Sequence, residues 1–500
     1  MPRVWCATLG CDKNLVDSEA LLGRFVGRGV ESVSDPQDAD IWILNTCGFI
    51  EAARRDSLEA VEELVATKGG RTLVVCGCWS QEHGDTIREM FPGVDVVAGV
   101  GRFDEVVAAC LDAGAEAASP GDTSAFPLAG PLVGDPMTAP YTGIVERPLL
   151  TPAHVAFVKI GEGCNFSCSF CRIPLIRGRQ RSRPVSEIRA EVASLVERGV
   201  AEVQLVSQNT SDYGRDSGEA LGDLVRALDG VDGLRRIRLF YLYSGVVAAD
   251  DLLRLLDVPK VVPYLDLPVQ HASPRLLKAM RRPGAERSSP DFFARLRRER
   301  PELVLRSTAL LGFPGEEDED VSLLADFLAE VEFDHLGTYR YSPEPGTASF
   351  ALPDRVPDEV ILDREALIQD LQEEIALRRM QRRLGQRHEV LIDRIIPADM
   401  ILDEGLDTVL AELAGDGDVL PGPEVDFAGD ASALAVGRSY HFGYDVDGVV
   451  LLPGAGLEPG AFVDVEFAAV TATDVWGLPV PTTNQRNSPG GTAEKGRRKP

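Results

Sequence analysis

Residues 161–171 read GEGCNFSCSFC, and this stretch decides how the rest of the sequence is interpreted. It brings three thiols, Cys164, Cys168 and Cys171, together at C-x3-C-x2-C spacing. A cubane iron–sulfur cluster normally takes four thiolates. Three thiolates from one tight loop leave one iron without a protein ligand, and that iron is open to a small reactive molecule. The spacing therefore predicts a cluster that takes part in chemistry, beyond simple electron storage.

Two other interpretations of this cysteine loop are a zinc site and purely structural thiols. Zinc sites usually take a second ligand pair further along the chain. No cysteine follows Cys171, and His271 is an isolated candidate. The specific spacing, directly after a strand-like run, favours the cluster.

Around the loop, residues 153–384 alternate between strand-like and helix-like patterns. Strands are expected at His154–Ile160, Glu202–Ser207, Arg236–Tyr241, Val262–Leu267, Leu303–Leu310 and His335–Tyr341. Helices are expected over 185–198, 219–229, 249–256, 273–281 with 290–299, 317–330 and 357–384. Six βα units with right-handed crossovers predict an open, partial (β/α)6 barrel. The cysteine loop follows the first strand, at the end where such barrels carry their active sites.

Residues 1–112 show a second α/β pattern. Short buried strands are expected at Val4–Leu9, Ile41–Asn45, Leu73–Gly77 and Val94–Ala98. Amphipathic helices are expected at Leu15–Arg28, Ile50–Ala66, Gln81–Met90 and Phe103–Leu111. This alternation predicts a small doubly wound α/β domain.

Three cysteines of this first domain, Cys11, Cys47 and Cys78, follow three different strands. The carboxyl ends of parallel strands are where such sheets bind ligands, and the helix N-termini beyond them favour thiolates and anionic clusters. We therefore expect these three thiols to converge on one rim. Cys6 and Cys76 lie within strands, where a cysteine is usually a small core residue, and Cys110 fits helix packing.

The remaining segments are less informative. Residues 113–152 are rich in Ala, Pro, Gly, Thr and Ser and are expected to be a linker or insertion. Residues 385–482 predict a small five-stranded β-barrel, with an acidic surface loop at 398–435 and a disordered tail at 483–500. The strands expected in this barrel are Glu389–Ile396, Tyr440–Val446, Gly448–Leu452, Phe462–Val470 and Asp474–Val480.

The composition is that of an ordinary globular protein, with 44% hydrophobic and 26% charged residues, but the net charge is −28. Between residues 387 and 480 there are three Arg, no Lys and 18 acidic residues, which leaves −15 in that segment. Such a field repels phosphate backbones and attracts basic partners. No stretch is long and apolar enough to span a bilayer, and no signal peptide is evident, so we expect a cytoplasmic protein without a membrane partner.

The segment Gly161–Asn165 together with Cys168 and Cys171 resembles the radical S-adenosylmethionine (SAM) enzymes. In that superfamily the open iron binds the amino and carboxylate groups of SAM. One electron then cleaves SAM to methionine and a 5′-deoxyadenosyl radical, which abstracts a hydrogen atom. The resemblance implies that Cys164, Cys168 and Cys171 hold a [4Fe-4S] cluster with this role.

Three further motifs, LGCDKNLVDSE at 9–19, NTCGF at 45–49 and GC at 77–78, resemble the methylthiotransferase family within that superfamily. The resemblance implies an α/β N-terminal domain, a radical SAM partial barrel and a C-terminal TRAM barrel, which is OB-like. It also implies a second [4Fe-4S] cluster with an open iron, held by Cys11, Cys47 and Cys78, and two SAM molecules per turnover. Spacing alone leaves Cys76 as an alternative to Cys78.

Within the family, residues 14–19 resemble the RimO branch, which modifies an aspartate β-carbon of ribosomal protein S-twelve. The alternative is a tRNA methylthiotransferase of the MiaB type. The acidic barrel favours the basic protein over nucleic acid as substrate, although an acidic surface is also common in acidic proteomes. An external electron donor and a sulfide source are implied. A further alternative is a protein that is not an enzyme, namely an iron–sulfur scaffold or an electron carrier.

The resemblance also suggests SAM contacts at Phe170, Gln208, Asn209, Arg183 and Gln270, which lie in the cysteine loop or near strand ends. Ordinary strand-to-helix turns explain any single one of these residues equally well. The basic run at 177–183 fits contact with nucleic acid, with the carboxylate of SAM or with the charge of a cluster. Beyond the cluster cysteines, no catalytic side chain is assigned.

Overall fold

The computed structural model describes residues 1–112, 130–137, 146–401, 404, 406–413 and 433–480. Most of the predicted linker at 113–152 and all of the predicted tail at 483–500 lie outside the described residues. The chain divides into two compact units, Met1–Ala376 and Leu377–Pro500. The first unit contains both α/β regions, so the boundaries between three domains stay a prediction.

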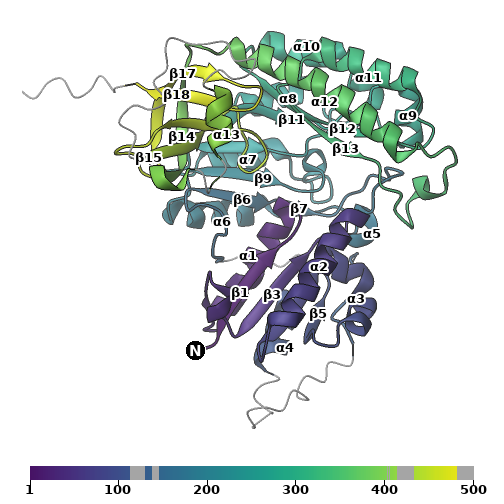
Figure 1. Ribbon diagram of the computed structural model, residues 1–500, viewed down its shortest axis with the longest axis vertical. Helices are drawn as coiled ribbons and strands as arrows, with labels where there is room; N and C mark the ends of the chain where they lie inside the picture. Colours follow the sequence, from purple (N-terminus) through teal and green to yellow (C-terminus); the bar gives the residue numbers. More distant parts are fainter. Residues whose placement is uncertain (113–129, 138–145, 402–403, 405, 414–432, 481–500) are drawn as a thin grey trace, which may run out of the picture. The chain divides into compact units, whose positions relative to one another are not determined.

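The first region is a five-stranded parallel sheet with the order β2-β1-β3-β4-β5 (Figure 1). Its strands are β1 Arg3–Thr8, β2 Glu31–Ser32, β3 Ile41–Thr46, β4 Thr72–Gly77 and β5 Val96–Ala98. Its helices are α1 Asp12–Gly27, α2 Glu51–Thr67, α3 Cys78–Met90 and α4 Phe103–Leu111. The order reverses between β1 and β3, and such a reversal is where doubly wound sheets bind ligands.

Helices cover both faces of this sheet, which is why its central strand β3 is buried along its whole length. On one face, Leu21, Phe25 and Val106 of α1 and α4 pack on the sheet. On the other face, Val61 and Ile87 of α2 and α3 do the same. The predicted doubly wound α/β fold is confirmed. The two-residue strand β2 was not predicted, because it is too short to show an alternating pattern.

The second region is a six-stranded parallel sheet with the order β13-β12-β11-β10-β9-β6. Its strands are β6 Val155–Lys159, β9 Glu202–Val206, β10 Arg236–Leu239, β11 Val261–Asp266, β12 Val304–Leu311 and β13 His335–Arg340. The helices of this region are α6 Val185–Glu197, α7 Leu221–Asp229, α8 Ala249–Leu256, α9 Pro274–Ala279, α10 Pro290–Glu299, α11 Asp318–Val331 and α12 Asp358–Gln381. The strands follow one another in chain order, so the predicted open (β/α)6 arrangement is confirmed.

Sequence signals explain where several of these helices begin. Ser273 and Ser289 each accept a hydrogen bond from a backbone N–H of the first turn of α9 and α10, and a proline follows each serine. Glu317 and Asp320 form a capping box at the start of α11. These caps fix the positions at which the loops from the strand ends enter the outer helices.

The second unit contains a closed barrel with the order β14-β15-β16-β18-β17. Its strands are β14 Arg387–Pro397, β15 Ala433–Arg438, β16 Val450–Pro453, β17 Phe462–Val470 and β18 Val475–Pro479. Its interior includes Val390, Phe442 and Phe467, all fully buried. The predicted small five-stranded barrel is confirmed.

Two predictions about this barrel are wrong in detail. Residues 440–446 form turns in place of a strand, because the Ser439 hydroxyl accepts from the His441 amide and the Asp447 carboxylate accepts from the Gly443 amide. The stretch 398–435 is also more than a loop where it is described. It contains a 3-10 turn at Ala398–Met400, helix α13 at Leu406–Ala411 and the beginning of β15.

No helix among the described residues is both long enough and apolar enough to cross a membrane.

Candidate functional site

The three N-terminal cysteines lie at the carboxyl ends of neighbouring strands, beside the point where the strand order reverses. Cys11 is the N-cap residue of α1, which follows β1, and Cys78 is the first residue of α3, which follows β4. Cys47 comes directly after β3. The partial positive charge at these helix N-termini favours thiolates over thiols.

Two tightly packed glycines bring these cysteines together. Gly10 has φ +94°, and a Cβ placed on it would lie 3.0 Å from the Cys47 sulfur. Gly77 has φ +102°, and a Cβ placed on it would clash with Oδ1 of Asn45. Both backbone conformations favour glycine, and both positions have no room for a side chain. The chain therefore turns sharply into Cys11 and Cys78 at a place where Cys47 is close by.

The structure separates Cys78 from Cys76, the alternative that spacing left open. Burial raises the pKa of Cys78 to about 12; Arg177 opposes this increase, and the thiolates of Cys11 and Cys47 add to it. Cys76 packs in the hydrophobic core, and after burial its strongest electrostatic neighbour is Cys6. Cys78 is therefore grouped with Cys11 and Cys47 at the strand ends, whereas Cys76 is grouped with Cys6 in the core.

The second cysteine loop lies between β7 (Gly161–Glu162) and β8 (Arg181–Ser182), which pair antiparallel. The Cys164 amide donates to the Gly178 carbonyl, and this bond closes the base of the loop. The sulfurs of Cys164 and Cys171 each lie 3.5 Å from the backbone N–H two residues further on. Backbone donors of this kind are typical around the thiolate ligands of iron–sulfur clusters.

The electrostatics of this loop fit ligands that lose a proton when metal binds. Burial, with a contribution from the thiolate of Cys168, raises the pKa of Cys164 to about 11 and of Cys171 to about 12. Arg282 lowers both pKa values, and its Nη1 lies 3.9 Å from the Cys168 sulfur. These thiols stay protonated at neutral pH until iron displaces the proton.

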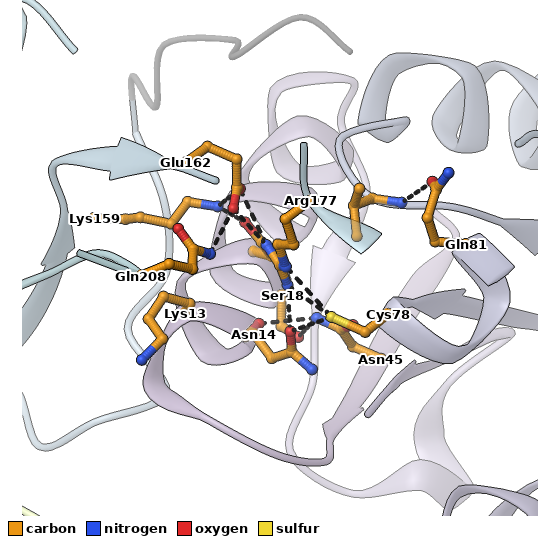
Figure 2. Close-up of polar contacts among 12 residues, drawn as sticks. Lys13, Asn14, Ser18, Asn45, Cys78, Gln81, Lys159, Glu162, Arg177 and Gln208 are labelled. Atoms are coloured by element: carbon orange, nitrogen blue, oxygen red, sulfur yellow. Dashed lines mark hydrogen bonds and ion pairs between the residues drawn. The ribbon is translucent and has the colours of Figure 1, made fainter. Parts of the chain in front are cut away.

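Arg177 joins the two groups of cysteines (Figure 2). It follows helix α5 (Ile173–Ile176), just beyond the second loop, and its Nε and Nη2 lie 3.3 and 3.2 Å from the Cys78 sulfur. On its other side, Nη1 donates to Glu162, which lies just before the loop of Cys164. The two α/β regions therefore meet where their cysteines lie.

Each helix that follows an N-terminal cysteine is tied to the radical SAM-like region. Asp12 and Lys13 of α1 contact Tyr241, through its hydroxyl at 3.2 Å and its ring centroid at 3.3 Å. Arg54 of α2 pairs with the buried Glu344 at 2.6 Å. In α3, Glu82 pairs with Arg172, which is adjacent to Cys171. The two regions are thus fixed to each other around the cysteines.

Two of the predicted SAM contacts lie in conformations that suit a ligand site. Asn209 follows β9 and is 4% exposed, yet both polar atoms of its side chain lack a hydrogen-bond partner among the described residues. Buried polar atoms are normally paired, so an unpaired amide is expected where a ligand completes the bonding. Gln270 follows β11 with φ +71°, and strained backbone of this kind clusters at functional sites.

The other three predicted SAM contacts already have protein partners. The Gln208 amide donates to Glu162 and accepts from the Gly163 amide. Phe170 packs on the apolar cluster around α9 and Phe313. Arg183 is 1% exposed and forms an ion pair with Glu191. Their roles in SAM binding stay predictions.

The donor chemistry of the cysteines fits an iron–sulfur cluster better than a zinc ion. Among the residues that the structure describes, no group of three or more His, Cys, Asp or Glu side chains is arranged to hold a single metal ion. A cubane, in contrast, takes its thiolates at separate corners. His271, the isolated zinc candidate, accepts backbone N–H bonds from Ala272 and Ser273 at the start of α9.

Several residues that shape this site were not predicted from the sequence. Glu344, Tyr241 and Arg282 each contact a site cysteine or its neighbouring helix, but none of them belongs to a sequence motif. The positive φ of Tyr241, +59°, also leaves no pattern in the sequence. The basic run at 177–183 was the one available signal, and Arg177 lies within it.

Comparisons with known proteins agree with this arrangement. The model for "Uncharacterized protein family UPF0004" matches residues 3–99, which contain the three N-terminal cysteines. The model for the "Radical SAM superfamily" matches residues 158–328, which contain the second loop. The fold and the site therefore define a radical SAM enzyme, a class that uses SAM and an iron–sulfur cluster.

Relatives with the name "Ribosomal protein uS12 methylthiotransferase RimO" match nearly the whole chain. Those from Alkalilimnicola ehrlichii and Methylococcus capsulatus are each 37% identical over 95% of this chain and over 97% and 98% of their own lengths. The relative from Pseudomonas paraeruginosa is 37% identical over 96% of this chain and 99% of its own length. The chain belongs to the RimO family of methylthiotransferases, which are enzymes that transfer methylthio groups.

Proposed function

We propose that this enzyme adds a methylthio group to the β-carbon of an aspartate in ribosomal protein uS12. The observation that carries the proposal is that Arg177 bonds both to Cys78 of one cysteine triad and to Glu162, which lies two residues before the first cysteine of the other triad. A radical enzyme that only abstracts hydrogen needs one triad. The second triad gives the site a place for the sulfur that is transferred. The names of the RimO relatives support uS12 as the protein that receives it.

Each triad holds one [4Fe-4S] cluster in this proposal. The radical SAM cluster takes Cys164, Cys168 and Cys171, and the second cluster takes Cys11, Cys47 and Cys78. Three protein ligands per cubane leave one iron open in each cluster. With SAM, the two clusters supply one-electron chemistry for an unactivated CH2 group and the sulfur that is added to it. The chain's own contribution would be to hold the cysteine-bearing segments of the two regions next to each other.

We assign SAM to the carboxyl ends of β9 and β11, where the unpaired amide of Asn209 and the strained Gln270 lie. Phe170, Gln208 and Arg183 complete the proposed surroundings. Gln208 acts through the backbone, because its amide oxygen accepts from Gly163 and thereby positions Cys164. Two SAM molecules per turnover, one for the methyl group and one for the radical, complete the stoichiometry.

The partners follow from charge and from chemistry. A net charge of −28 attracts a basic ribosomal protein and repels tRNA, so nucleic acid is disfavoured as the substrate. The clusters require an external electron donor and a sulfide source. All nine cysteines are free, which is the state typical of the cytoplasm, where we place the enzyme.

A substrate comparison tests the proposal. The reconstituted, reduced enzyme is incubated with SAM and either uS12 or tRNA, and mass spectrometry measures the added SCH3 group. We expect the mass increase on uS12 alone, at one aspartate, and no increase with a Cys168→Ala variant. Modification of tRNA alone would replace this proposal with the MiaB-type alternative. If the reconstituted, reduced enzyme forms no 5′-deoxyadenosine from SAM, the electron-carrier alternative is favoured.

A further inference from the structure

Arg177 uses every one of its N–H groups inside the protein. It is 2% exposed, and its Nε and Nη2 donate to the Cys78 sulfur at 3.3 and 3.2 Å. Nη1 donates to Asp17 at 2.8 Å and to Glu162 at 3.0 Å, and Nη2 also donates to Asn14. Since a guanidinium has five donors, all five are occupied, and its orientation toward the sulfur is fixed.

The two carboxylates that bind Arg177 also bind a lysine. Lys159 forms ion pairs with both Asp17 and Glu162, so two cations share two carboxylates. Glu162 forms ion pairs with both Arg177 and Lys159. Without Cys78 this group of four side chains is electrically neutral. A Cys78 thiolate would bring the total charge of the group to −1, and its sulfur would accept two N–H bonds from the guanidinium.

The same group reaches the other cysteine loop. The Gln208 amide donates to Glu162 at 2.6 Å, and its oxygen accepts from the Gly163 amide at 2.9 Å. Gly163 immediately precedes Cys164. A continuous chain of hydrogen bonds therefore runs from the Cys78 sulfur, through Arg177 and Glu162, to the backbone at Cys164.

We propose that Arg177 is a positioning residue for the second cluster, and that its two hydrogen bonds to Cys78 raise the reduction potential of that cluster. Hydrogen bonds to cluster sulfurs stabilise the reduced state, which carries more negative charge. The residue that supplies them belongs to the radical SAM region, so this potential depends on contact between the two regions. The inference rests on the second cluster of the proposed function.

Redox titration of the second cluster tests this inference. The parent protein carries Cys164→Ala, Cys168→Ala and Cys171→Ala, so that only the N-terminal triad binds iron. Electron paramagnetic resonance then gives the midpoint potential, and iron analysis gives the occupancy. Relative to this parent, Arg177→Gln should shift the redox equilibrium at least tenfold toward the oxidised form, which is about 59 mV for a one-electron couple. Arg177→Lys keeps the charge but loses the two-donor fork, so a smaller shift in the same direction is expected.

A matched control separates this effect from general damage to the fold. Arg238 of β10 is equally buried, at 0% exposed, and pairs with Glu202 of β9 at 3.1 Å. Arg238→Gln removes a buried arginine from an ion pair with a carboxylate. It should therefore lower the stability of the fold and leave the midpoint potential of the second cluster unchanged. A shift in this control equal to that of Arg177→Gln would overturn the proposal.

A second measurement needs no substitution at Arg177. With arginine labelled with 15N, hyperfine spectroscopy of the reduced parent should show weak coupling between the guanidinium nitrogen and the cluster. If iron is bound and this coupling is absent, or if the potential of Arg177→Gln equals that of the parent, the inference fails and the two-cluster proposal stands. If the parent binds no iron at the N-terminal triad, the two-cluster proposal itself fails and takes the inference with it.

Discussion

At the scale of single residues, nine cysteines of one chemical type lie in clearly different surroundings. Cys76 faces the core and has Cys6 as its strongest electrostatic neighbour, whereas Cys78, two residues later, receives two N–H bonds from a buried arginine. A thiol that accepts charged hydrogen bonds is a better metal ligand than one surrounded by hydrocarbon. Local environment, more than sequence position, therefore distinguishes ligand cysteines from core cysteines.

Replacing Cys11 by Ala should separate the methylthiolation of uS12 from the cleavage of SAM. Because Cys11 belongs to the N-terminal triad only, methylthiolation of uS12 should fall by at least about 100-fold. Production of 5′-deoxyadenosine should persist, since the loop of Cys164 is unchanged. Liquid chromatography with mass spectrometry measures both products. Cys110→Ala removes a thiol of α4, outside both triads, and should retain both activities; full methylthiolation by the Cys11 variant would refute the two-cluster assignment.

The glycine before Cys78 provides a prediction about iron binding. Gly77→Ala forces a positive φ on alanine, at a cost of about 1–3 kcal/mol, and also drives its Cβ into Asn45 and the Thr46 carbonyl. We expect lower stability and loss of iron from the N-terminal triad. Chemical denaturation and iron analysis measure the two effects.

Gly199→Ala is the matched control for this prediction. Gly199 has nearly the same φ, +104°, but has no atom within 4 Å of an added Cβ. The Gly199→Ala variant should therefore lose stability only through the positive φ forced on alanine, and it should keep its iron. Equal iron loss in the two variants would contradict a specific role for the close packing at Gly77.

The positions of the proposed ligand residues could be predicted from the sequence because they obey spacing and strand-end rules. Cys11, Cys47 and Cys78 each follow an expected strand, and the structure places each of them at a strand end. Arg177 obeys no such rule, because a long side chain that reaches 99 positions back along the chain leaves no periodic signal. Contacts of this type depend on how two regions dock, and a single sequence does not encode docking locally.

At the scale of helices and strands, the parallel sheets were predictable, and the barrel was predictable only in part. Buried strands in parallel sheets contain continuous apolar runs, such as residues 41–44, and these are easily recognised. The Tyr-His-Phe-Gly-Tyr run at 440–444 alternates like a strand, but side-chain bonds to its own backbone fold it into turns. Short apolar runs next to Ser, Asp and Gly are therefore the least reliable strand predictions.

Strand β14 of the barrel should show a pH-dependent stability. Burial lowers the pKa of His388 from its ordinary value to about 4, with a further contribution from Arg383. The unfolded chain takes up a proton below about pH 6.5, and the folded barrel takes it up only near pH 4. The stabilising contribution of neutral His388 is therefore complete above about pH 6.5 and is lost as the pH falls toward 4.

Hydrogen exchange of peptides from β14, measured in the full chain at about pH 7 and about pH 5 and corrected for the intrinsic exchange rate, tests this prediction. Protection should decrease more between these two values in the native chain than in His388→Phe. Phenylalanine cannot titrate, and it retains the contact with Phe467, whose ring centroid lies 4.4 Å from that of His388. Identical pH slopes in the two proteins would show that His388 does not control the stability of the strand.

At the scale of the whole molecule, the acidic charge predicts how substrate binding responds to salt. Electrostatic attraction to a basic protein weakens as ionic strength rises, because the Debye length shortens from about 30 Å at 0.01 M to about 8 Å at 0.15 M. The KM for uS12 should therefore rise with salt. A KM that is independent of salt would argue against steering by charge.

Removing charge from the second unit should weaken this effect. The exposed Asp399, Glu412 and Glu458 are replaced by Asn, Gln and Gln, and KM at low salt should rise on the order of threefold. The control replaces three exposed acids of the first unit, Glu62, Glu89 and Glu187, by Gln, so that the net charge changes equally. Equal increases in KM would indicate a generic acidic surface and no dedicated docking face on the barrel unit.

The order of the elements along the chain has a consequence for biosynthesis. Synthesis proceeds from the N-terminus, so Cys11, Cys47 and Cys78, on a sheet that is complete by Ala98, leave the ribosome before Arg177 has been translated. During that interval the N-terminal triad has no guanidinium at Cys78 and no radical SAM region against it. The N-terminal cysteines are therefore accessible during synthesis until the region that begins at β6 has been made and has folded against them.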